Sequence, residues 1–321
     1  MKRDLALPGG LVPVERLKRS AEKPARTEPA SGQAQIDARA LWKRLRETVE
    51  GEVRFDPGSR GLYAQDASNY YHLPLGVVLP RHADDVVAVI DACRAAGAPI
   101  VARTGGTALA GQTCNEALVL DFSKYMRHIR EIDEARRIAR VEPGVICDEL
   151  ARAAKPYRLT WGPKPATHSH CGFGGMLSNN CGGMNAQYSG IAVHNVEALD
   201  VVLYDGTRMH LGWMTEDDVA RAIAAGGRAG SVHRAIADLR DRYRTRIEAG
   251  YPKLPRRVSG YNLDELLFKE DGRFNLARAI VGTEGTCVTI TEATVRLVDL
   301  RPERVVVALG FADVFTAADH V

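Results

Sequence analysis

Residues 103–112 read Arg-Thr-Gly-Gly-Thr-Ala-Leu-Ala-Gly-Gln and follow directly on a short apolar run at 98–102 that predicts a buried strand. The adjacent Gly105 and Gly106 permit positive φ and let backbone N–H groups approach an anion without interference from a Cβ atom. Clusters of such N–H groups bind pyrophosphate. The segment therefore indicates a phosphate-binding turn, although a tight turn that needs glycine for backbone reasons alone fits the same residues.

Read from Gly106, the same segment is one residue short of the P-loop of nucleotide hydrolases. It gives G-x-x-x-x-G-Q-T, with Gln112 in the place of the lysine. Without that cation the β- and γ-phosphates lose a principal charge stabiliser. The NTPase interpretation is therefore disfavoured.

Two further glycine segments lie downstream. Residues 171–183 read C-G-F-G-G-M-L-S-N-N-C-G-G, and residues 281–286 read V-G-T-E-G-T between two apolar runs. Residues 171–183 fail as a dinucleotide fingerprint, because Met176 and Leu177 stand where the third glycine belongs. Three glycine loops, each at a strand end, indicate one extended ligand.

The hydrophobic periodicity predicts an α+β fold with two sheets. Helices are predicted over 36–49, 83–96 and 146–154, and strands over 76–79, 98–102, 118–121, 129–132, 138–141, 198–204, 208–211, 278–282 and 288–298. The strand–helix–strand order at 76–102 is typical of a βαβ unit, which predicts a small parallel sheet in the first subdomain. The later strands predict a larger, mostly antiparallel sheet.

Four regions follow from this pattern. Residues 1–35 are rich in Pro, Gly, Ser and charge and predict a disordered tail. The pattern predicts two subdomains, at residues 36–122 and 123–299. The second has a polar helical insertion at about 213–276. A strand at 304–311 and a helix at 315–320 predict that residues 300–321 begin a further domain that is cut off.

Composition limits the class of protein. The net charge is +3, from 43 basic and 40 acidic residues, which argues against a dedicated nucleic-acid binder. The sequence has no apolar run of transmembrane length and no signal peptide, so a cytoplasmic location is expected. Six scattered cysteines predict reduced thiols, and His168, His170, Cys171 and Cys181 match no zinc-site spacing.

Six short motifs occur together in one order: P-x-x-x-x-D-V from Pro80, R-T-G-G-T from Arg103, V-E-P-G from Val141, G-G-M-L-S-N-N-x-G-G from Gly174, V-x-x-x-D-G from Val201 and G-T-E-G-T from Gly282. In this order they resemble the PCMH-type FAD-binding domain of the vanillyl-alcohol oxidase superfamily. The resemblance is to the FAD-linked D-lactate, glycolate and D-2-hydroxyglutarate dehydrogenases and covers about residues 40–300. It implies a two-subdomain FAD-binding fold followed by a cap domain.

The resemblance also implies roles for individual residues. The pyrophosphate would be held by the first glycine loop (103–112). The adenine–ribityl path would follow the second loop (171–183), and the third loop (281–286) would lie across the domain from the first. The residues implied are Arg103, Thr104, Gly105, Gly106, Thr107, Gly111 and Gln112; Pro163, Gly174, Gly175, Ser178, Asn179, Gly182 and Gly183; and Gly282, Glu284 and Gly285, with Asn195 and Val196 near the adenine.

Thr107 stands where members of the superfamily with covalently attached flavin often have histidine. Threonine offers no nucleophilic nitrogen, so non-covalent FAD is expected. Cys114 and Cys181 remain the alternative points of attachment.

The substrate implied is a D-2-hydroxy acid, with lactate first and 2-hydroxyglutarate second. Arg256, Arg257 and Tyr261 precede the third glycine loop, and a guanidinium suits a substrate carboxylate, although surface cations fit the pattern too. Electrons would pass to a quinone, cytochrome or iron–sulfur carrier, which allows a peripheral position at the inner membrane. In the family that the chain resembles, the base and the metal ligands lie in the cap, so no catalytic residue is assigned. An alditol or sugar oxidase and a non-catalytic flavin-binding fragment remain as alternatives.

Overall fold

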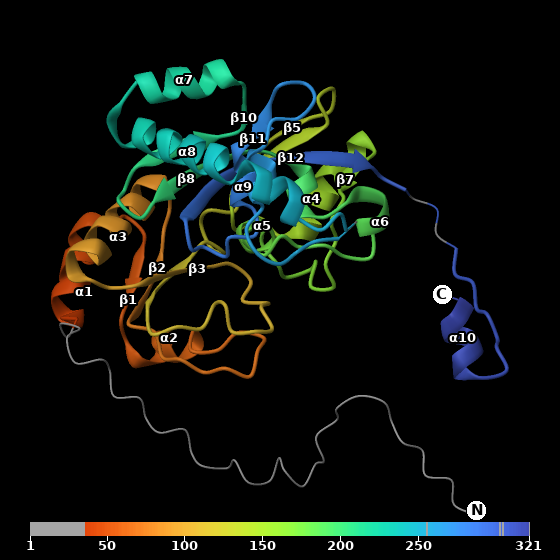
Figure 1. Cartoon of the computed structure of the whole chain (residues 1–321). Coiled ribbons are helices and arrows are strands. Elements are labelled where there is room, and N and C mark those ends of the chain that lie inside the picture. Colours follow the sequence, from red (N-terminus) through yellow and green to blue (C-terminus); the bar gives the residue numbers. More distant parts are fainter. Residues whose placement is uncertain (1–35, 255, 302, 304, 321) are drawn as a thin grey trace, which may run out of the picture. The chain divides into compact units, whose positions relative to one another are not determined.

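Two β-sheets form the framework of the chain (Figure 1). The structure is a computed structural model that describes residues 36–254, 256–301, 303 and 305–320. The fold is α+β, as predicted. The tail predicted at 1–35 lies outside the described residues, and the subdomain boundaries stay predictions.

The small sheet has the strand order β1-β2-β4-β3. Its strands are β1 (Glu52–Arg54), β2 (Gly76–Leu79), β3 (Ile100–Arg103) and β4 (Leu118–Asp121). Strand β4 lies between β2 and β3 and is parallel to both, as the βαβ pattern predicts, but β1 is antiparallel to β2. The sheet is therefore mixed. The polar triplet of β1 carries no apolar run, so the sequence did not reveal this strand.

Helices α1 (Ala38–Thr48) and α3 (Ala83–Ala96) pack against each other beside this sheet (Figure 1). The Asp37 carboxylate accepts hydrogen bonds from the first turn of α1, where it replaces missing helical partners. Helix α3 buries Val86, Val89, Ile90 and Cys93 at helical spacing. It ends at Gly97, whose φ of 63° is a left-handed cap.

The large sheet is antiparallel, in the order β5-β6-β12-β8-β9. Its strands are β5 (Ile129–Asp133), β6 (Ile138–Val141), β8 (Val196–Leu203), β9 (Arg208–Leu211) and the central β12 (Val288–Asp299), with β7 (Leu159–Trp161) paired to the end of β12. A hydrophobic core lies on this sheet, and Trp161 and Phe173 meet edge to face within it, 5.2 Å between ring centroids.

Further helices connect the strands. They are α2 (Pro57–Leu62), α4 (Cys147–Ala154), α5 (Phe173–Ser178), α6 (Ala186–Ser189), α7 (Glu216–Ala224), α8 (Gly227–Gly250) and α9 (Leu276–Ile280), with 3-10 turns at Lys155–Tyr157, Ala192–Asn195 and Leu263–Leu266 and a two-stranded ribbon of β10 (Trp213–Met214) and β11 (Phe274–Asn275). The strand predicted at 278–282 is wrong, because this segment forms most of α9. The Asn275 side chain caps that helix by accepting from the Arg278 N–H.

The strand predicted at 304–311 is also wrong. Its described residues are irregular, and the side chains of Val305, Val306 and Val307 are exposed. A run of valines favours a strand only where another strand pairs with it, and none of the described strands does so. Helix α10 (Val314–His320) follows, close to the predicted position.

Candidate functional site

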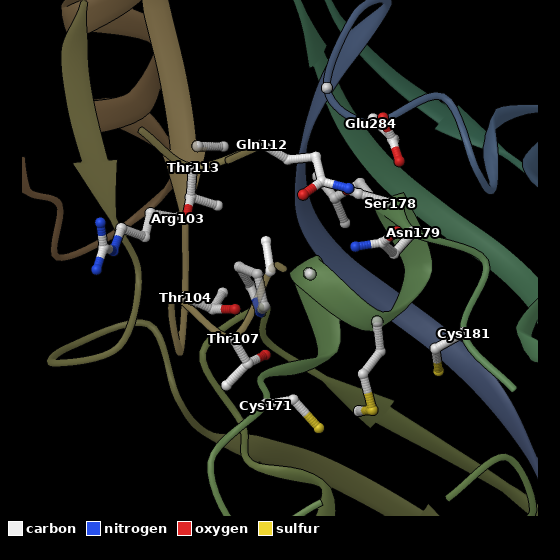
Figure 2. Close-up of a pocket in the computed structure, with 18 of the residues that line it drawn as sticks. Arg103, Thr104, Thr107, Gln112, Thr113, Cys171, Ser178, Asn179, Cys181 and Glu284 are labelled. Carbon is white, nitrogen blue, oxygen red and sulfur yellow. The ribbon is translucent and has the colours of Figure 1, made fainter. Parts of the chain in front are cut away.

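The three glycine loops meet around one cavity of about 530 Å³. Its walls include β3 of the small sheet and the start of β12 of the large sheet, so the cavity lies between the two sheets. Figure 2 shows Thr104 and Thr107 on one side of this space and Ser178, Asn179 and Glu284 on the other. The volume is in the range of small-molecule and cofactor sites, about 300–1,000 Å³.

Most of the predicted cofactor residues line this cavity. They are Arg103, Thr104, Gly106, Thr107, Gln112, Gly174, Gly175, Ser178, Asn179, Gly182, Glu284 and Gly285. The predicted substrate residue Arg256 lines it as well.

In the first loop, the Arg103 side chain points away from the cavity (Figure 2). Its guanidinium donates to the carbonyl oxygens of Tyr63 and Gln65, at 3.3 and 2.8 Å, and stacks on the Tyr63 ring. A buried or half-buried guanidinium with these partners is fixed in place. Arg103 therefore contributes to the cavity through its backbone and anchors the loop with its side chain.

Residues before β2 brace the other end of this loop. The Asp66 carboxylate accepts from the backbone N–H and the hydroxyl of Thr113, and Gly111 packs against Tyr70. Burial opposes ionisation of Asp66, but the hydrogen bonds from Ser68 and Thr113 prevail and lower its pKa. Asp66 and Tyr70 had no assignable role in the sequence, since the contact joins segments over 40 residues apart.

The first loop presents free backbone donors. None of the N–H groups of residues 104–109 donates a hydrogen bond to another residue in the described part of the chain. Backbone N–H groups left unpaired in a folded protein need water or a ligand. A run of them beside a cavity suits a pyrophosphate.

The second loop lies directly against the first. A Cβ atom on Gly105 would meet the His170 carbonyl oxygen at 2.2 Å, and one on Gly172 would meet the Thr104 side chain at 2.8 Å. Only glycine permits this approach of the two backbones. Phe173, buried against Trp161, fixes the start of α5, which carries Gly174, Gly175 and Ser178 to the cavity wall.

The third loop is bonded to the second. The N–H groups of Gly282 and Glu284 donate to the carbonyl oxygens of Leu177 and Ser178, both at 3.0 Å. Glu284 has a φ of 51°, an unusual conformation for a residue with a side chain. Strained backbone of this kind persists where surrounding contacts determine it, often at a ligand site.

Part of the cavity wall is apolar, with one exception. Ile100 and Val101 of β3 and Val288 and Ile290 of β12 line the cavity, and the Thr289 hydroxyl between the latter two is buried without a hydrogen-bond partner among the described residues. The Tyr204 hydroxyl, which lies near Thr289, donates to the Gly285 carbonyl. A flat ring with a polar edge would suit this part of the wall and could bond to Thr289. With the free N–H groups of the first loop, these features fit an FAD.

Other predicted residues lie outside the cavity lining. Gly105 and Gly183 are packed between loops, Gly111 and Gly282 lie behind it, and Pro163 and Val196 are buried, with the Val196 carbonyl accepting from Arg278. The buried Asn195 amide donates to the carbonyls of Ser189 and Ile191.

The structure separates the three predicted substrate residues. Arg257 is paired with Asp264 at 2.6 Å and stacks on Tyr251, and the Tyr261 hydroxyl bonds to Thr286. Neither residue lines the cavity, whereas Arg256 does and forms no ion pair with the described residues.

The histidines beside the second loop have local partners. His168 bonds Asp148 at 2.7 Å, and His170 bonds Ser169. Within the described residues, no group of three or more His, Cys, Asp or Glu side chains is arranged to hold a metal. All six cysteines are free thiols.

Comparison with known proteins gives the class of protein. Residues 74–212 match the family described as FAD binding domain. An alkyldihydroxyacetonephosphate synthase structure superposes with a TM-score of 0.58 at 14% identity, covering 83% of this chain and 41% of that one. The 6-hydroxy-D-nicotine oxidase of Arthrobacter nicotinovorans gives 0.52 at 19% identity, covering 78% and 43%. The chain carries an FAD-binding domain of the PCMH-type fold.

Sequence relatives narrow the class. A D-2-hydroxyglutarate dehydrogenase of Pseudomonas putida is 32% identical over 270 residues, 83% of this chain and 27% of the relative. The glycolate oxidase subunit GlcD of Bacillus subtilis is 32% identical over 260 residues, 79% and 44% respectively. The chain is therefore similar in sequence to a dehydrogenase and an oxidase subunit named for 2-hydroxy acids. It spans about a quarter to under half the length of these relatives.

None of the described helices is both long enough and apolar enough to cross a membrane.

Proposed function

We propose that this chain holds the FAD of an oxidoreductase that oxidises a D-2-hydroxy acid, with 2-hydroxyglutarate preferred over lactate. The observation that carries the proposal is a cavity with N–H groups from residues 104–109 and a guanidinium, Arg256, that have no partner in the described part of the chain. The preference for 2-hydroxyglutarate rests on four relatives of that name at 27–32% identity.

The cavity-lining residues of the three loops would hold the cofactor. The N–H groups of residues 104–109 would bind the pyrophosphate, and the apolar part of the wall beside Thr289 would take a ring. Thr107 lines the cavity, but its hydroxyl is a poor nucleophile for forming a covalent bond to the flavin. This supports non-covalent binding. Of the two alternative cysteines, Cys181 lines the cavity and Cys114 does not.

Arg256 would hold a substrate carboxylate. It is exposed and lies over Gly182 of the second loop, with its Nε 3.3 Å from the position of a Cβ on that glycine. A planar guanidinium binds a carboxylate through two parallel hydrogen bonds. The ion pair with Asp264 and the stacking on Tyr251 give Arg257 a supporting role for the segment that carries Arg256.

When bound, FAD supplies the acceptor for the two electrons of the hydroxy acid. The chain's own residues bind and orient the two reactants. No described residue is assigned as the base. The acceptor that reoxidises the flavin would be a quinone, cytochrome or iron–sulfur carrier.

The test uses the purified chain, loaded with FAD, with a dye as electron acceptor. We expect reduction of the dye with D-2-hydroxyglutarate, slower reduction with D-lactate and none with the L-enantiomers. Arg256→Lys should raise KM for the acid by about tenfold, because a single ammonium replaces a bidentate contact. Equal turnover of both enantiomers would contradict the proposal. FAD binding without turnover would favour the second candidate, a non-catalytic flavin-binding module.

The mode of FAD attachment is tested separately. All flavin should leave the protein on acid or urea denaturation. Flavin that stays with the precipitated protein would contradict non-covalent binding, and peptide mapping would then locate the attachment.

A further inference from the structure

Two cysteines face each other beside the cavity. Ile146, just before α4, forms an antiparallel bridge with Gly172 of the second loop. One step along, the Cys147 N–H donates to the Cys171 carbonyl at 3.1 Å. In a regular antiparallel ladder, residues at this position have Cα atoms about 5.5 Å apart. Disulfides join Cα atoms about 4.4–6.8 Å apart, so a pair at this spacing lies within the range that a disulfide can bridge.

Only one of the two thiols has a route to small molecules. Cys147 is 1% exposed and sits at the start of α4, while Cys171 is 5% exposed and lines the cavity. Figure 2 shows Cys171 below Thr107, at the end of the cavity away from Glu284. A reagent in the cavity would therefore reach Cys171 first, and Cys147 would be reached through it.

The two thiols also differ in acidity. The Cys147 thiol is the main cause that lowers the pKa of Cys171, with help from Thr167. The same contact, together with burial, raises the pKa of Cys147. A thiol with a lowered pKa is the better attacking group near neutral pH.

No other cysteine in the described chain has this arrangement. Burial raises the pKa of the Cys93 thiol, in α3, to about 12. Cys114 contacts the Tyr70 carbonyl. Cys181 lines the cavity and lies near Cys171, but its backbone pairs with Met176 and Ala192 and not with either cysteine of the pair. Cys287 lies beside the Thr286 hydroxyl.

We propose that Cys147 and Cys171 are a reversible thiol–disulfide pair, oxidised by a low-molecular-weight disulfide that enters the cavity when FAD is absent and shielded when FAD is bound. The Cys171 thiolate attacks one sulfur of the disulfide RSSR, forms a Cys171–SR bond and releases RS⁻. The Cys147 thiolate then attacks Cys171, forms the protein disulfide and releases the second RS⁻. The two cysteines lose two electrons, RSSR gains them, and the two thiol protons leave with the two RSH.

The oxidation state of the Cys147–Cys171 pair would depend on whether FAD fills the cavity. An oxidised pair links the start of α4 to the start of the second glycine loop, 24 residues apart in the chain (171 − 147). This inference needs FAD in the cavity but not the 2-hydroxy-acid activity, so loss of turnover leaves it standing.

The experiment treats the full chain, free of FAD, with oxidised glutathione at pH 8 and maps cross-linked peptides without reduction. We expect a Cys147–Cys171 disulfide that dithiothreitol reverses. With FAD at about 100 times its Kd, only about 1% of the protein is empty, so oxidation should slow by about 100-fold. Cys147→Ser should stop at a glutathione adduct on Cys171, and Cys181→Ser should form the disulfide at the wild-type rate.

Three results would overturn the proposal. The first is a Cys171–Cys181 cross-link in place of the expected one. The second is the absence of any cross-link in the folded wild-type protein, although the unfolded protein reacts with oxidised glutathione. The third is equal oxidation rates with and without bound FAD, where flavin fluorescence confirms that the cofactor is bound.

Discussion

Two cavities border the large sheet of this protein, and they differ in how their polar groups are used. The cavity at the glycine loops, about 530 Å³, has polar groups with no partner among residues that the structure describes: the N–H groups of 104–109, the Thr289 hydroxyl and Arg256. The second, about 380 Å³, contains more charge, but its charges are paired with protein groups. The pairs are Glu142 with His128 and Arg130, Asp200 with His210, Arg208 with Asp84, and Glu292 with Arg140. Unused hydrogen-bonding capacity, and not charge or size, separates a ligand site from a structural crevice.

The comparison is sharpest on one strand. Thr289 and Thr291 are two residues apart on β12, and both are buried. Thr289 lines the first cavity and has no partner among the described residues, while Thr291 lines the second and donates to the Asp200 carbonyl at 3.0 Å. Among the described residues, the same residue type therefore has a free hydroxyl in one cavity and a hydrogen bond within the fold in the other.

The largest effect is expected from Gly105→Ala. The added Cβ would meet the His170 carbonyl oxygen at 2.2 Å, so the first and second loops must separate. Overpacking of this kind costs about 1–3 kcal/mol. Here it weakens the contact between the two loops that shapes the cavity. FAD affinity should fall by about 10- to 100-fold, as measured by flavin fluorescence titration. An unchanged Kd would show that contact between the loops does not shape the site.

Glu142→Gln, in the second cavity, should lower stability and leave FAD affinity unchanged. The Glu142 side chain is 4% exposed and accepts from His128 and Arg130. Hydrogen bonds to a charged group contribute about 1.5–3 kcal/mol, so the free energy of unfolding should fall by about that amount. FAD affinity should not change. Urea denaturation and flavin titration on the same variant measure both, and a weakened Kd would mean that the two cavities are coupled.

Thr289→Val and Thr291→Val form a matched pair with smaller effects. Thr289→Val removes an unsatisfied buried hydroxyl, so the free protein should keep or gain stability while FAD affinity falls by about 3- to 10-fold, the worth of one hydrogen bond of about 1 kcal/mol. Thr291→Val breaks a bond within the protein, so stability should fall by about 1 kcal/mol with FAD affinity unchanged. The reverse pattern would refute the difference between the cavities.

The smallest effect concerns Asp66, which braces the first loop. Its pKa in the folded protein is lowered, against about 3.9 in an unfolded chain. The stability that it contributes is therefore fully present above about pH 4 and is lost as the pH falls below that value. Asp66→Asn should flatten the pH dependence of unfolding below about pH 4 and weaken FAD binding a few-fold. Denaturation curves across this range would check it, and an unchanged slope would contradict it.

The parts of the fold that sequence could predict are those with a repeating local pattern. Val86, Ile90 and Cys93 mark α3 at helical spacing, and the predicted strand at 76–79 matches β2. Prediction failed at α9 because five residues, Leu276–Ile280, are too few to separate a helix from a strand by periodicity. It failed at 304–311 because a strand depends on a partner that local residues do not reveal.

The site was predictable in its loops but not in its contacts. Glycine spacing located the three segments, and these do meet at one cavity. The anchoring of Arg103 on Gln65, the bracing of Thr113 by Asp66 and the pairing of Cys147 with Cys171 all join distant segments. Arg256 and Arg257 are neighbours in sequence, yet only the folded backbone decides which of them lines the cavity.

Hydrogen–deuterium exchange of the chain with and without FAD tests the central claim most directly, because it reads the backbone N–H groups themselves. FAD should slow exchange at residues 104–109 and around the second and third glycine loops, and leave the residues around Glu142 and Asp200 unchanged. Unchanged exchange at 104–109 in FAD-saturated protein, or protection confined to the second cavity, would contradict the account.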